Sequence, residues 1–105
     1  MKKSDMIKTI LDAEVNAWLE LAKYDFDNKP ITTTWEQEKA FTENDLGHIK
    51  LLNQWYGIKT VMESMGIAST WNEKTAEATD INHAIWMREQ NARGIYYDDD
   101  GNRTA

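Results

Sequence analysis

Large apolar side chains recur at helical spacing through the middle of this chain, and that spacing restricts the fold more than any other feature of the sequence. Steps of four, three, four and three residues place one strip within roughly 80° of a helical wheel: Leu51, Trp55, Ile58, Met62 and Met65. A second apolar strip, made by Ile49, Leu52 and Tyr56, lies about a quarter to a third of a turn away. A helix with two apolar strips contacts two neighbours, so we predict that this helix is central.

Similar patterns predict helices before this one. A first helix is expected from Ser4, whose side chain can cap it, to about Tyr24. Residues 25–34 are typical of a connection and contain the only proline of the chain. A short helix is expected next, because Thr34 and Gln37 fit a capping box.

The segment after the central helix predicts one more helix and a tail. Gly66 suits the left-handed residue that ends the central helix, and Gly94 repeats this signal. The last helix can start at Thr70 or at Thr79, and the sequence leaves both open. Residues 93–105 are expected to form a strand and turn or a flexible tail.

Length and pattern together predict a single domain, residues 1–105, with an all-α fold. We expect a compact bundle of three main helices plus one short helix. The chain contains no cysteine, and the sequence shows neither a signal peptide nor an apolar stretch that could span a membrane. These features favour a cytoplasmic protein.

Acidic residues are concentrated in one part of the chain. The net charge is −6, and residues 25–45 hold six acidic side chains against two lysines. Phosphate contacts require clustered Lys and Arg, so we expect no direct nucleic-acid binding. An acidic segment is usually a solvated face. The sharper interpretation is a surface that meets a basic partner or mimics DNA.

Several aromatic side chains lie outside the apolar strips, in predicted connections, capping turns or the tail. They are Trp35, Phe41, Trp71, Tyr96 and Tyr97. If exposed beside the acidic side chains of Glu36, Glu38 and Glu43, they would form an anchor surface for a protein partner. The equally weighted alternative is that these rings fill a thin core.

Two Asp-x-x-His pairs are the candidate metal ligands of the chain. Asp45 with His48, and Asp80 with His83, have a spacing that places both side chains on one helix face, and Glu14 lies within the apolar face of the first helix. The geometry argues against a shared site, because His83 projects away from the apolar strip of its helix. We therefore expect no metal or cofactor. We expect Glu14 to pair with a lysine or an indole N–H, or to lie at the edge of the buried stripe.

Residues 51–57, Leu-Leu-Asn-Gln-Trp-Tyr-Gly, and residues 62–67, Met-Glu-Ser-Met-Gly-Ile, resemble small helical accessory proteins encoded by bacteriophages. The resemblance covers about a fifth of the chain. It implies an intracellular protein that acts by stoichiometric binding, in some cases as an inhibitor of a host protein.

The sequence therefore favours a non-enzymatic protein-interaction module that binds a partner through exposed aromatic residues and the acidic segment. One alternative is a DNA mimic that blocks a basic, nucleic-acid-binding protein. A second alternative is a metal-dependent hydrolase built on Asp45, His48 and Glu14. A homodimer is equally compatible with a two-faced helix.

Overall fold

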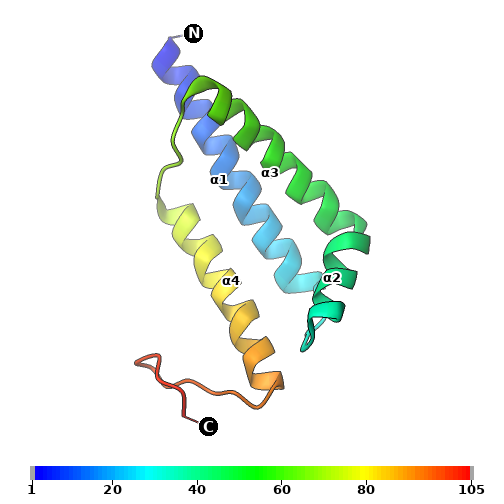
Figure 1. Ribbon diagram of the computed structural model, residues 1–105. Coiled ribbons are helices and arrows are strands. Elements are labelled where there is room, and N and C mark those ends of the chain that lie inside the picture. Colours follow the sequence, from blue (N-terminus) through cyan, green and yellow to red (C-terminus); the bar gives the residue numbers. More distant parts are fainter. Residues whose placement is uncertain (1, 105) are drawn as a thin grey trace.

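The protein is all-α, as the sequence predicts. The computed structural model describes residues 2–104. In this part of the chain there are four helices: α1 (Lys3–Asn28), α2 (Trp35–Asn44), α3 (Leu46–Met65) and α4 (Glu73–Ala92) (Figure 1). Three long helices and one short helix confirm the predicted fold class.

Helix α1 is the centre of the bundle. Both α3 and α4 pack on α1, and α2 packs on α3, whereas among the described residues the backbones of α3 and α4 do not come close to each other (Figure 1). The prediction that the helix around residues 49–65 is central is therefore wrong. The physical reason is that α1 buries residues directed to both neighbours, including the small side chains of Ala17 and Ala22, which let two helices approach closely.

The resulting bundle is flat and open. Its dimensions are 54 × 34 × 21 Å and its radius of gyration is 16.4 Å, against about 13 Å for a typical globular domain of 100 residues. Much of α3 consequently faces solvent, and its fully buried residues are few. Exposed apolar side chains on this helix include Leu46, Tyr56, Val61 and Met65.

The core lies along α1 and uses two of the tryptophans. Leu19 and Ala22 of α1 pack with the fully buried Ala78 of α4. On the other side of α1, the rings of Trp18 and Trp55 meet with centroids 4.8 Å apart. Two indole rings therefore fill a thin core between α1 and α3.

Helix starts follow local capping chemistry, with two corrections. The Thr34 side chain accepts a hydrogen bond from the Gln37 backbone N–H, as predicted. Helix α4 starts at neither threonine considered, because Asn72 caps it and forms a capping box with Thr75. Ser4 does not cap α1, which begins at Lys3 without a side-chain cap.

Helix ends also follow the sequence, except at α1. Gly66 and Gly94 both have positive φ, 69° and 80°, as their predicted roles after α3 and α4 require. The Ile67 N–H bonds back to the Met62 carbonyl, which closes the last turn of α3. Helix α1 continues to Asn28, so the connection expected over residues 25–34 is shorter than predicted.

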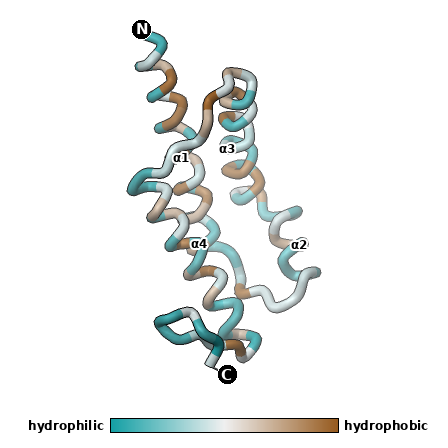
Figure 2. Tube along the Cα trace, turned by 60° about the vertical axis from the view of Figure 1, so that its left-hand side comes forward, coloured by the Kyte–Doolittle hydropathy of each residue, from teal (hydrophilic) through white to brown (hydrophobic). Residues whose placement is uncertain are grey.

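The C-terminal segment folds back on itself. Tyr97 and Arg103 form an isolated antiparallel bridge, and the Thr104 N–H donates to the Tyr96 carbonyl at 2.7 Å. The Asp98 carboxylate accepts from two backbone N–H groups inside the turn. Figure 2 shows this turn as a hydrophilic loop beside the end of α4. The described part of the tail is thus a turn closed by a single bridge, and it contains no strand.

Two glycines of α3 provide a matched test of packing between α1 and α3. A Cβ on Gly47 would collide with the ring of Tyr24, whereas a Cβ on Gly57 would meet nothing within 4 Å. We predict that Gly47→Ala lowers the free energy of unfolding by about 1–3 kcal/mol, because Tyr24 must move. Gly57→Ala should raise it by about 0.5–1 kcal/mol, since alanine favours a helix. Urea denaturation measures both, and a stabilised Gly47→Ala protein would contradict the packing described.

Candidate functional site

The connection between α1 and α2 is fixed to the end of α4 by a network of charged and polar groups. Lys29 Nζ lies 2.5 Å from Glu38 Oε2 and 3.2 Å from Glu89 Oε1. The second Glu89 oxygen accepts from the backbone N–H of Thr32 at 3.1 Å and also from the Thr32 hydroxyl. Thr32 is buried, as is the Lys29 side chain. The network therefore orders the residues that precede α2.

Glu89 is held in its charged form. Burial alone would raise the pKa of this carboxyl, but hydrogen bonds from Thr32 and the Lys29 charge outweigh burial and leave the pKa below its ordinary value of 4.5. A carboxyl whose pKa is lowered in the folded state stabilises the fold at pH values above the ordinary pKa of the group. That contribution is lost as the pH falls through the lower, folded-state pKa.

Trp35 is the first residue of α2 and its side chain stands in solvent. It is 71 % exposed, although indole is among the side chains that gain most from burial. It lines a cavity of about 350 Å³ between the start of α2 and the end of α4, together with Trp86 and Arg93. Glu38 lines the same cavity. Trp35 and Glu38 were expected at a binding surface, and the structure brings them together.

Six lining residues of this cavity were not expected from the sequence. Thr32, Thr34 and Arg93 belong to the connections, whereas Trp86, Glu89 and Gln90 line the cavity from α4. The latter three follow one another at steps of three and one, so they share one side of α4. The sequence alone therefore predicts that these three side chains lie close together. It does not predict a site there, because the loop before α2 is brought beside α4 only by the tertiary structure.

The C-terminal turn extends the aromatic surface around the end of α4. The ring centroids of Tyr97 and Trp86 are 5.2 Å apart, and the His83 ring stacks on Trp86 at 5.8 Å. These three rings and the turn line a second cavity of about 290 Å³. Tyr96, the neighbouring residue, is half-exposed. We call Trp35, Trp86, Tyr96 and Tyr97 the aromatic end of the molecule.

Two of the expected aromatic anchors lie elsewhere. Phe41 is buried and its ring lies 5.1 Å from the His48 ring, so the expectation that it belongs to an exposed anchor surface is wrong. Trp71 is 69 % exposed but precedes α4. It is separated from Trp86 by more than half of the 20-residue helix, about 20 Å. The predicted single patch is therefore divided between two ends.

The acidic segment is partly used inside the fold. Asp25 Oδ1 and His48 Nδ1 share a hydrogen bond of 2.7 Å. Burial raises the pKa of Asp25 above its ordinary value, and the hydrogen bond with His48 offsets only part of this increase. Asp45 caps α3 by accepting from the His48 N–H, which lowers its pKa, and also accepts from the Tyr24 hydroxyl. Glu36 and Glu43 remain exposed on α2. The negative surface is consequently smaller than the sequence suggests.

The metal-ligand candidates do not converge. Asp45 and His48 lie at the start of α3, whereas His83 stacks on Trp86 in α4, close in sequence to Asp80. Glu14 is buried, and it accepts from Ser69 at 3.2 Å with Lys59 3.9 Å away, which confirms its predicted pairing with a lysine. Within residues 2–104, no group of three or more potential ligands could hold a metal ion.

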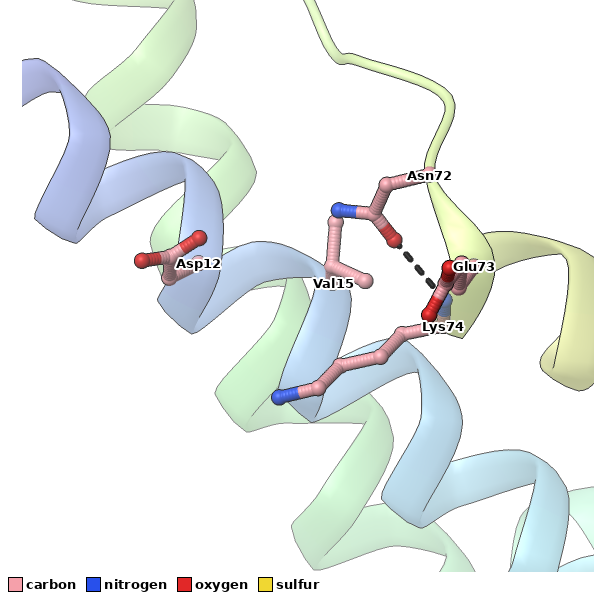
Figure 3. A pocket seen from close by; sticks show the side chains of 5 residues that line it. All are labelled: Asp12, Val15, Asn72, Glu73 and Lys74. Carbon is pink, nitrogen blue, oxygen red and sulfur yellow. Dashed lines mark hydrogen bonds between the residues drawn. The ribbon is translucent and has the colours of Figure 1, made fainter.

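A further cavity, of about 240 Å³, lies between α1 and the start of α4 (Figure 3). The Asn72 side-chain oxygen points at the backbone N–H of Lys74, as the dashed line in Figure 3 shows. The Lys74 side chain runs back along α1 and donates to Asn16 at 2.6 Å. Asn72 and Lys74 are therefore engaged in starting α4 and attaching it to α1.

Comparison with known proteins gives no match: no family model, no curated protein and no solved structure searched is similar to this chain. Across residues 2–104, no helix is long and apolar enough to cross a membrane.

The Glu89 network can be tested by its pH dependence. We predict that Glu89→Gln lowers the free energy of unfolding at neutral pH by about 1–3 kcal/mol, because charge-assisted hydrogen bonds are lost. The loss should shrink as the pH falls below the ordinary carboxyl value of 4.5. Denaturation at several pH values measures both effects. Glu36→Gln, on the exposed face of α2, is the control and should change little. A constant loss at every pH would contradict the assignment.

Proposed function

We propose that this protein is a non-enzymatic, cytoplasmic interaction module that binds a protein partner through its aromatic end. The observation that carries the proposal is the exposed Trp35 ring at the mouth of a cavity shared with Trp86. Tryptophan is the side chain most enriched among residues that dominate binding energy. A ring kept in solvent by an ordered, hydrogen-bonded loop is available to a partner at little cost in entropy.

Charge supports the same surface as a contact for a basic partner. Glu36 and Glu43 are exposed on α2, and Asp98, Asp99 and Asp100 are exposed in the adjacent C-terminal turn. Opposite charge on a partner would raise the association rate and select against acidic proteins. Such stoichiometric binding is compatible with an accessory or inhibitor role.

The two alternative functions have less support. A DNA mimic needs a broad negative surface, but Asp25, Glu38 and Asp45 are engaged in contacts within the fold. A metal-dependent hydrolase needs ligands that converge, and the described residues hold no such group. The exposed apolar side chains of α3 favour a homodimer as a second mode of association, and sedimentation equilibrium would measure it.

Trp35 and Trp71 form a matched pair for testing the interaction surface, because both rings are about equally exposed and lie at opposite ends of α4. We predict that Trp35→Ala abolishes capture of a partner from bacterial lysate, whereas Trp71→Ala retains it. The loss should correspond to about 2 kcal/mol or more of binding energy. Circular dichroism checks that both variants are folded.

Equal capture by Trp35→Ala and the unaltered protein would contradict the proposed function. So would loss of the partner in Trp71→Ala alone, because that result would place the binding surface at the other end of the molecule.

A further inference from the structure

A small cavity lies where α3 and α4 are held apart on α1, and it is separate from the aromatic end. Its volume is about 180 Å³, and all three long helices contribute to its lining. The polar lining residues are Asp25 of α1, His48 of α3 and Asn82 of α4. Every lining residue is buried or half-buried. The cavity therefore reaches into the bundle, and it shares no lining residue with the two cavities at the aromatic end.

The His48 ring is held in a fixed orientation with one nitrogen unused. Its Nδ1 shares the hydrogen bond with Asp25, and its ring packs on Phe41. His48 is only 7 % exposed, and Nε2 makes no hydrogen bond with any of residues 2–104. The fully enclosed polar side-chain atoms without a partner in this part of the chain are Trp55 Nε1 and Arg88 Nε. Nε2 is not one of them, so it keeps accessible surface, and His48 lines the cavity.

The partner of Nδ1 decides what Nε2 can do. When the Asp25 carboxylate accepts the Nδ1 proton, the neutral imidazole carries no proton on Nε2, which is then a hydrogen-bond acceptor. Asn82 lines the same cavity from α4, is half-buried, and its carboxamide makes no hydrogen bond within the described chain. A hydroxyl group can donate to an imidazole nitrogen and accept from an amide N–H at the same time. A ligand with one hydroxyl therefore uses the groups that His48 and Asn82 leave free.

The other lining residues and the volume favour a small, neutral ring. Trp18, Leu21 and Leu52 form apolar walls, and burying a charged group among apolar side chains is costly. A cation gains little from Asp25, because that carboxylate already pairs with His48, and an anion is repelled by it. An apolar cavity of about 150 Å³ holds one benzene molecule. A cavity of about 180 Å³ therefore accommodates one aromatic ring with a hydroxyl group.

We propose that this cavity binds a small phenol. Its ring would lie among Trp18, Leu21 and Leu52, and its hydroxyl would donate to His48 Nε2 and accept from the Asn82 carboxamide. A phenol is preferred over an aliphatic alcohol because its more acidic hydroxyl is the better donor to imidazole. The inference goes beyond the proposed function, since it adds a small-molecule site away from the surface that meets the partner.

The test titrates phenol into the intact, ¹⁵N-labelled protein at pH 8, where an imidazole is ordinarily neutral. Long-range ¹H–¹⁵N correlation spectra report the two ring nitrogens of His48 separately, and the Trp18 indole N–H reports the apolar wall. We expect saturable changes at His48 Nε2 and at the Trp18 indole, in the millimolar range.

A second probe and two variants separate the hydrogen bonds from apolar contact. Toluene has the shape of phenol without the hydroxyl. Asn82→Leu keeps the size of the side chain but removes the carboxamide, so it should weaken phenol about five-fold and leave toluene no weaker. Asn53→Leu makes the same exchange at an exposed position of α3 and should change neither affinity. Circular dichroism first checks that both variants are folded.

A phenol group can belong to a free small molecule or to a tyrosine side chain of another protein. The buried and half-buried lining favours the free molecule, because an attached main chain would need an open rim. p-Cresol, which is the tyrosine side chain alone, should therefore compete with phenol, whereas Nα-acetyl-tyrosine methylamide should not.

The absence of saturable changes at His48 Nε2 and Trp18 would overturn the inference. It would also be overturned if Asn82→Leu weakened phenol no more than toluene, or if benzoate bound more tightly than phenol. Tighter binding of the tyrosine probe than of p-cresol would refute the small-molecule site. None of these results bears on partner capture through Trp35, which tests the proposed function separately.

Discussion

The packing of α3 and α4 on two sides of α1, with their backbones held apart, is the constraint on which the rest of the structure depends. Helix α4 packs on α1 alone and α3 packs on α1 and the short α2, so much of the surface of both helices faces solvent and the buried core is thin. The ends of the helices therefore need additional attachments. The Glu14 carboxylate of α1 contacts Lys59 of α3 and Ser69 of the connection after α3. The Glu89 carboxylate of α4 contacts Lys29 and Thr32 in the loop after α1.

The second of these attachments produces the candidate site. Because Glu89 fixes Thr32, the residues that lead into α2 have a defined course, and Trp35 begins the helix beside Trp86 instead of moving freely on a linker. An ordered, exposed indole loses little conformational entropy when a partner covers it.

Features that depend on a few neighbouring residues could be predicted from the sequence. The Thr34 cap and the helix ends at Gly66 and Gly94 are of this kind, because their hydrogen bonds close within one or two turns. The central position of α1 could not be predicted in this way, because the two apolar strips of α3 indicate an interior helix as strongly as the pattern of α1 does. Likewise Glu89 and Gln90 are ordinary polar residues of a helix until the tertiary structure brings the loop before α2 to them.

The central claim is that Trp35 and Trp86 form one surface that a partner covers, while Trp71 stays free. Fluorine NMR of protein labelled with fluorotryptophan, in the presence of a soluble paramagnetic agent, reports the solvent accessibility of all five indoles in one spectrum. In the free protein, Trp35 and Trp71 should be the most strongly relaxed, and Trp18 and Trp55 the least. With the captured partner, protection of Trp35 and Trp86 alone is the predicted result; protection of Trp71 with Trp35 still exposed would contradict the account.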